Sequence, residues 1–160
     1  MDPHVELLRN LFLTHPAWLS AARSIKDGST SSVRFSHVQG AYHLLRKEGQ
    51  SLLLSGPAAD PDLAFRFTPR AIERLCTVQG SDIADFGVAL MECARSEDPE
   101  LQVRLRVVAG FSKLLRRGYV SLLMKGGPRV LAYGGRGASL MEVRKLLSQM
   151  RADDGAWDHE

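Results

Sequence analysis

Residue types that carry chemistry are present in this chain but do not stand at catalytic spacings. The five histidines form no His-x-x-x-His pair, and the two cysteines form no Cys-x-x-Cys pair. The sequence also contains no Gly-x-Ser-x-Gly elbow for a serine nucleophile. His37 and His43 would face each other across paired strands, but surface or half-buried histidines are the better interpretation than a metal site. We therefore expect no catalytic residues, no bound metal and no cofactor.

Cys76 and Cys93 both fall inside amphipathic helical patterns, which is typical of small buried hydrophobic side chains. This interpretation predicts a reducing, cytoplasmic setting. The first residues lack a basic segment, and Glu6 and Arg9 interrupt the apolar stretch, so a signal peptide is not expected. The apolar runs are far shorter than the ~20 residues that span a bilayer.

A glycine-rich stretch, residues 134–139, is predicted to join a strand to the start of a helix. Its backbone N–H groups and Arg136 could hold an anion. It matches neither of the common nucleotide-binding loops, and Ser139 with Glu142 forms a capping box for the helix that follows. A flexible turn before a capped helix is the favoured interpretation.

Charge is distributed unevenly along the chain. The overall net charge is +3, but residues 101–151 carry eleven lysines and arginines against one acid, Glu142. A local excess of this size attracts anionic lipid headgroups, an acidic protein or nucleic acid, unless the acidic part of the chain balances it in the fold. Nucleic acid is the least expected partner, because the two aromatic residues near the basic residues, Phe111 and Tyr119, fall on apolar positions.

Hydrophobic periodicity divides the chain into helices and strands. It predicts one domain over residues 1–151, with N-terminal helices at 4–24, a core at 32–127, a C-terminal strand and helix at 128–151, and an acidic tail at 152–160. Alternating residues indicate strands at 33–39, 42–46, 51–55, 63–67, 101–107 and 129–133. Helical spacing indicates further helices at 69–76, 83–94, 111–125 and 139–150. Consecutive strands followed by helices favour an α+β fold whose mostly antiparallel sheet of about five strands has helices on one face.

Two segments carry a resemblance to a known family. One is Asp62–Leu75, a strand that runs into a helix started by Thr68 and Pro69, and the other is Leu101–Gly110 followed by an apolar helix. With the strands before them, these segments resemble the sterol carrier protein 2 (SCP2) family of lipid-binding domains over about residues 32–124. The resemblance implies a sheet of about five strands and a hydrophobic cavity for acyl chains or sterols between sheet and helices.

The expected function is the non-enzymatic binding of an apolar small molecule or lipid. Arginines near the cavity would contact its headgroup or an anionic membrane, and we expect these to be Arg104, Arg106, Arg116 and Arg117. The residues expected to line the cavity are Phe65, Phe67, Ile83, Phe86, Leu90, Val103, Leu105, Phe111, Leu114 and Leu115.

A second hypothesis belongs to a different class of protein. Apolar stripes on helices are more often ordinary core than the wall of a cavity. If the core is closed, the chain would be an interaction or regulatory module whose basic C-terminal face docks an acidic protein or nucleic acid. A binding affinity that falls steeply with salt would indicate this second class.

Overall fold

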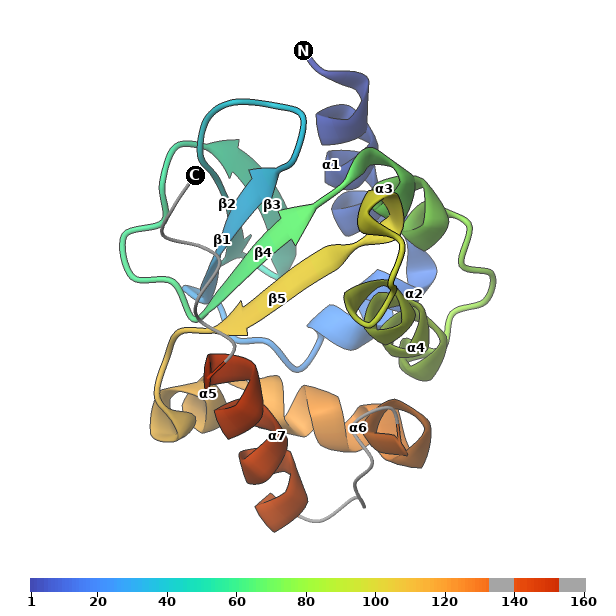
Figure 1. Cartoon of the computed structure of the whole chain (residues 1–160). Coiled ribbons are helices and arrows are strands. Elements are labelled where there is room, and N and C mark those ends of the chain that lie inside the picture. The colour runs from blue at the N-terminus through green and yellow to red at the C-terminus, as the bar shows by residue number, and fades with distance from the viewer. Residues whose placement is uncertain (133–139, 153–160) are drawn as a thin grey trace.

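A five-stranded sheet with helices over one face forms the framework of the protein (Figure 1). The computed structural model describes residues 1–132 and 140–152. The spatial order of the strands is β3-β2-β1-β4-β5, and only the β1–β4 pair is parallel. The strands are β1 (Thr30–Phe35), β2 (Tyr42–Lys47), β3 (Gln50–Ser55), β4 (Leu63–Phe67) and β5 (Val103–Val107). The predicted α+β class and mostly antiparallel sheet are thus confirmed.

The helices are α1 (Pro3–Thr14), α2 (Pro16–Ala22), α3 (Pro69–Cys76), α4 (Ile83–Ala94), α5 (Phe111–Arg117), α6 (Tyr119–Ala132) and α7 (Leu140–Ala152), with a short 3₁₀ turn at Pro99–Leu101. Figure 1 shows α5, α6 and α7 at the end of the sheet toward which β5 points, and α1 to α4 beside the remainder. None of the described helices is long and apolar enough to cross a membrane.

Strand register decides which side chains face the helices. Val33 lies opposite Phe65, and Phe65 lies opposite Leu105, so these three share one face, which we call the inner face. Arg34, Arg66 and Arg104 stand opposite one another in the next row and share the outer face, because side chains alternate along a strand.

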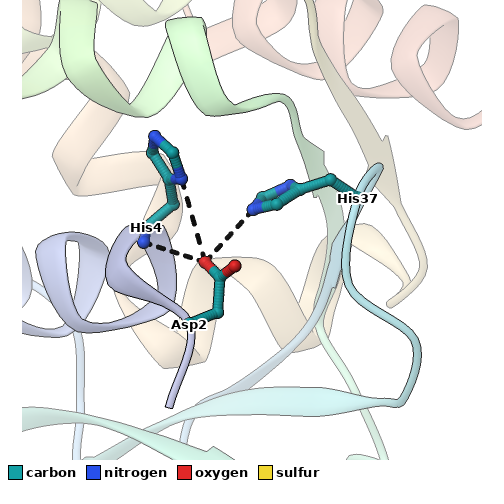
Figure 2. Close-up of side chains that lie close together, drawn as sticks. All are labelled: Asp2, His4 and His37. Carbon is teal, nitrogen blue, oxygen red and sulfur yellow. Dashed lines mark hydrogen bonds and ion pairs between the residues drawn. The ribbon is translucent and has the colours of Figure 1, made fainter.

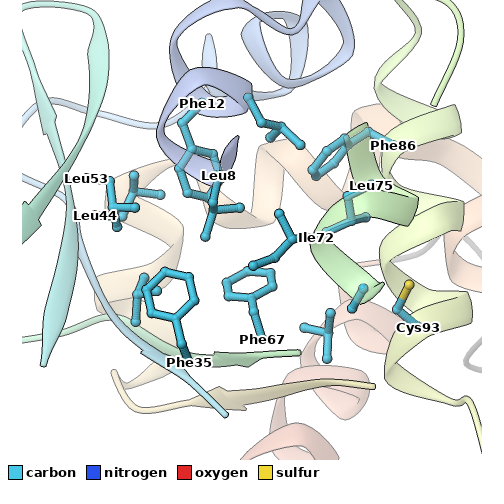
Figure 3. Close-up of a cluster of buried hydrophobic side chains, with 14 of the residues drawn as sticks. Leu8, Phe12, Phe35, Leu44, Leu53, Phe67, Ile72, Leu75, Phe86 and Cys93 are labelled. Atoms are coloured by element: carbon cyan, nitrogen blue, oxygen red, sulfur yellow. The ribbon is translucent and has the colours of Figure 1, made fainter. Parts of the chain in front are cut away.

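A closed core covers one end of the inner face. Phe35 and Phe67, neighbours on β1 and β4, pack with Leu8 of α1 and Ile72 of α3 (Figure 3). These side chains are at most 5% exposed. A smaller cluster at the other end joins β5 to the last helices through Val107, Leu114, Tyr119, Val120 and Leu147. Between the two clusters the inner face borders a cavity, which is described below.

Two strand predictions need correction. The strand predicted at 33–39 begins at Thr30 and ends at Phe35, since Ser31 and Ser32 pair with both neighbouring strands. The strand predicted at 129–133 does not form over its described part, because α6 remains helical to Ala132. Tyr133, the glycine-rich stretch up to Ser139 and the acidic tail after Ala152 lie outside the described residues.

The helix predicted at 111–125 is also wrong, because it is two helices that meet at Gly118. This glycine has φ +89°, which ends α5 in the left-handed region, and a Cβ atom there would lie 1.7 Å from the carbonyl oxygen of Ser24. The chain bends where the backbone after α2 approaches it most closely. The same approach carries a hydrogen bond from the Lys26 N–H to the Arg117 carbonyl.

We predict that Gly118→Ala destabilises the fold by about 4 kcal/mol or more, because backbone cannot move aside as a side chain can. Gly49→Ala is the matched control, since Gly49 also has a positive φ, +73°, but nothing lies within 4 Å of the added Cβ. The control should cost only about 1 kcal/mol of left-handed strain. Urea unfolding measures both values, and equal losses would contradict the close approach at Gly118.

Candidate functional site

The main candidate site is a cavity of about 150 Å³ between the inner face and the helices, at the end of the sheet where β5 finishes. The sheet forms its floor, and α2, α4, α6 and α7 form its walls and roof. The residues along it are Trp18, Ala21, Ile25, Ser29, Ser31, Leu44, Arg46, Ser51, Leu63, Phe65, Ile83, Phe86, Gly87, Leu90, Met91, Leu105, Val107, Tyr119, Leu122, Leu123, Gly126, Leu147 and Met150.

Half of the residues expected to line a cavity do so. They come from β4, β5 and the inward side of α4, and they are Phe65, Ile83, Phe86, Leu90 and Leu105. Phe67 follows Phe65 on β4 and Val103 precedes Leu105 on the antiparallel β5, so both lie one inward position nearer the closed core, to which they belong. Their binding role, like that of the five wall residues, remains a prediction.

The three expected lining residues on α5 lie elsewhere. Leu114 is buried in the second cluster, and Phe111 packs on that cluster beneath the guanidinium of Arg144. Leu115 is 47% exposed on the surface. Because α5 ends at Gly118, its apolar side turns toward α6 and α7 instead of toward the cavity.

One corner of the otherwise apolar wall is polar. Ser29, Ser31, Arg46 and Ser51 are buried side chains on or beside the first three strands, and all four border the cavity. Arg46 and Ser51 are directly paired residues of the β2–β3 hairpin, and Nη1 of Arg46 donates to Oγ of Ser51 over 3.0 Å. Burial lowers the pKa of Arg46, and the nearby Asp27 carboxylate acts in the opposite sense. The guanidinium nevertheless remains charged at any physiological pH.

Beside this corner, a buried carboxylate is balanced by the charge of Lys113 and a hydrogen bond from Tyr119. Asp62 is 1% exposed, and its Oδ2 accepts hydrogen bonds from the Tyr119 hydroxyl at 3.2 Å and the Thr30 N–H at 3.3 Å. The Lys113 ammonium lies 3.1 Å from Oδ1 of Asp62. Burial and the Asp62 charge raise the pKa of Tyr119. The backbone of Asp62 meanwhile accepts from the N–H groups of Val108 and Ala109, which fixes the end of β5.

The arginines expected to bind anions fall into two groups. Arg104 and Arg106 lie on the outer face of the sheet, away from the cavity, and share that face with Arg34 and Arg66. Arg116 and Arg117 lie in the last turn of α5. None of these four predicted arginines borders the cavity. Their role in binding an anion remains a prediction.

A separate cluster of possible metal ligands joins the chain's start to the loop after β1 (Figure 2). Oδ1 of Asp2 lies 3.2 Å from Nε2 of His37 and also accepts from the N–H groups of His4 and Val5. Burial alone would raise the pKa of Asp2, but these hydrogen bonds outweigh it and hold the pKa below its usual value. The carboxylate thus acts as the N-cap of α1.

Cys76 and Cys93 are free thiols, and burial raises the pKa of both. A thiol with a raised pKa holds little of the reactive thiolate at neutral pH. Cys93 packs in the closed core (Figure 3), in agreement with its predicted role as a small hydrophobic side chain.

Comparison with known proteins adds a likeness of fold. No protein-family model and no curated protein matches the chain. A solved structure titled "UbiJ-SCP2 Ubiquinone synthesis protein" is similar over 78% of this chain and 84% of its own, with 20% sequence identity and a TM-score of 0.44. Its title names the family that residues 32–124 were predicted to resemble. The likeness concerns the fold alone.

The polar corner is the part of the site that the sequence analysis missed, although a signal for it exists. Leu44 and Arg46 are two residues apart, so a strand that points the first toward the core points the second to the same face. Ser31 and Val33 stand in the same relation on β1. A charged residue at an inward position of a strand is the pattern that would have indicated the corner.

We predict that Tyr119→Phe lowers the free energy of unfolding by about 1 kcal/mol at pH 8, because the hydrogen bond to Asp62 is lost. The difference should shrink as the pH rises above about 10, where an unfolded tyrosine ionises. Because the pKa of Tyr119 is raised in the folded protein, only the unfolded wild type ionises there, and this ionisation favours unfolding. Phenylalanine has no such group, so the stability of the variant does not fall in this way. Urea unfolding at the two pH values checks both parts, and a difference that grows with pH would contradict them.

Proposed function

We propose that the protein binds an apolar ligand in the cavity between the inner face and the helices, without catalysing a reaction. The observation that carries this proposal is the cavity wall, in which four helices and the sheet contribute almost only apolar side chains. An apolar pocket with a few polar groups at one place is the usual form of a small-molecule site. The buried end of the cavity, at Arg46, carries the polar corner, and the apolar wall provides the area that would contact a ligand.

The size of the cavity limits the ligand. A pocket of about 150 Å³ matches the scale at which an apolar protein cavity takes up benzene. A single acyl or isoprenoid chain meets this limit, because it can enter in extended form and continue through the opening. Each buried methylene contributes about 0.8 kcal/mol, so a few carbons inside the wall already give measurable affinity.

We place the opening of the cavity among α4, α6 and α7. Wall residues on β2, namely Leu44 and Arg46, are buried, whereas Met91, Leu122 and Met150 on these three helices are half-buried. A ligand would therefore enter between the helices and advance toward the sheet. Methionine and leucine side chains at this position adapt readily to ligands of different shape.

We predict that Leu105→Trp, which adds an indole ring to the cavity floor, weakens binding of 1-dodecanol at least tenfold, because the ring occupies the volume that the chain would take. Isothermal titration calorimetry of wild type and variant measures the change.

Leu54→Trp is the matched control, because Leu54 is exposed on β3 and does not border the cavity. It should bind dodecanol as the wild type does. Failure of the wild-type protein to bind dodecanol, together with no lipid in an organic extract of protein purified from cells, would overturn the proposed function.

A second proposed function is docking of the outer face on an anionic membrane. The five strands contain no aspartate or glutamate, so every charged side chain on this face is basic or a histidine. Arg34, Arg66 and Arg104 form a row across β1, β4 and β5. A row of cationic side chains on one face attracts an anionic bilayer surface.

Leucines elsewhere on the same face favour a membrane over other anionic partners. By alternation, Leu45 of β2 and Leu52 and Leu54 of β3 share the outer face, and Leu54 is exposed. A face that combines arginines with leucines suits the boundary between headgroups and acyl chains. Each arginine near an anionic bilayer contributes about 1 kcal/mol.

We predict that the double variant Arg34→Glu with Arg104→Glu binds vesicles of phosphatidylcholine with about 30% phosphatidylserine at least tenfold more weakly than the wild type does. Vesicle sedimentation at low and at physiological salt measures the loss.

Arg23→Glu with Lys26→Glu changes the net charge by the same amount at exposed positions just after α2, and it should bind nearly as the wild type does. Equal losses in the two double variants would show attraction by net charge only. Wild-type binding to an oligonucleotide or an acidic peptide, but not to vesicles, would replace this proposal with the interaction-module hypothesis.

A further inference from the structure

Within the part of the chain that the structure describes, the buried guanidinium of Arg46 has few hydrogen bonds and no paired carboxylate to balance its charge. Arg46 is 8% exposed, and its Nε atom has no hydrogen-bond partner. Among the described residues, no carboxylate lies within ion-pair distance of its guanidinium. A buried charge is costly unless a counter-charge and hydrogen bonds balance it. The single hydrogen bond to Ser51 meets only part of that need.

The acids nearest to the corner already have other partners. Asp27 raises the pKa of Arg46 through its field, and its Oδ1 accepts a hydrogen bond from the Gly49 N–H. Asp62 is paired with Lys113 and accepts from the Tyr119 hydroxyl. A positive potential therefore remains at the closed end of the cavity.

Hydroxyl groups around Arg46 would complete a site for an anionic oxygen group. Ser29 is 2% exposed and borders the cavity, with its hydroxyl close to that of Tyr119. Ser31 and Ser51 border the same corner. Hydroxyls donate readily to an oxyanion, and a guanidinium donates two parallel hydrogen bonds to one carboxylate.

We propose that the cavity binds a single-chain amphiphile head first, with its carboxylate at Arg46 and its chain extending past Leu105 toward α4 and α6. This inference rests on the proposed ligand-binding function and adds the class of ligand and its orientation. The buried end of the cavity is the polar one and the half-buried end is wholly apolar, so charge and shape both select this orientation. A carboxylate is small enough to fit the corner beside three serines.

The test compares two probes of equal chain length, dodecanoic acid and 1-dodecanol, by calorimetry at pH 8 on the intact protein. Wild type should bind the acid at least tenfold more tightly than the alcohol, because only the acid neutralises Arg46. Arg46→Met should bind the acid at least tenfold more weakly than wild type and keep its affinity for the alcohol. Arg23→Met, at an exposed position just after α2 that does not border the cavity, is the matched control and should change neither affinity.

A thermal scan of the ligand-free variant separates a ligand role from a structural one. An arginine that holds the fold together would lower the midpoint of unfolding when replaced. An arginine retained for its ligand leaves the midpoint unchanged or raised in Arg46→Met, since a buried charge is replaced by an apolar side chain of similar length.

A spectroscopic measurement on wild-type protein keeps the proposal testable if the variant does not fold. The pKa of dodecanoic acid labelled with ¹³C at the carboxyl should be lower when bound than when free, because the guanidinium favours the ionised form. An unchanged or raised pKa, or equal affinities for acid and alcohol in wild type, would overturn the head-first orientation and leave the apolar cavity as proposed. Binding of neither probe would overturn both.

Discussion

The structure depends on how one face of a five-stranded sheet is covered along its length. At the Phe35–Phe67 end, α1 and α3 cover it with close-packed side chains. At the Val107 end, α4, α6 and α7 meet above it around a cavity. A side chain's contribution therefore depends on its row in the sheet: Phe67 stabilises the core, whereas Phe65, two residues before it, borders the cavity.

The polar groups at the cavity end follow from the same arrangement. Serines and one arginine are tolerated at inward positions there because those positions do not have to complete the packed core. Asp62 serves the framework instead, since its backbone and side chain tie the start of β4 to β1, to the end of β5 and to α6. Nearby Arg46 lacks such a set of partners. Asp62 has enough partners to stabilise the fold, whereas the buried charge of Arg46 has few among the described residues. A buried charge with few protein partners is available to bind a ligand.

Local signals predicted most of the elements, and tertiary contacts decided the rest. The alternation through Phe65 and the Thr68–Pro69 helix start depend on neighbouring residues, so the sequence alone indicated β4 and α3. The break at Gly118 depends on Ser24, ninety-four positions away, and no local pattern contains that contact. Cavity residues on β4, β5 and α4 were predictable as inward apolar positions, whereas Trp18, Leu147 and Met150 border the cavity only because α2 and α7 dock there.

The parallel pairing of β1 with β4 has a consequence for the order of folding. The β2–β3 hairpin needs only local contacts and can form within microseconds, but the central strand β1 has the hairpin on one side and waits for β4 on the other. During synthesis this second side stays open until residue 67 has left the ribosome, and β5 follows only after α3 and α4. Until then β1 is an edge strand with an unpaired row of backbone hydrogen-bonding groups. The strand that becomes the centre of the sheet is therefore the one most exposed to mispairing during synthesis.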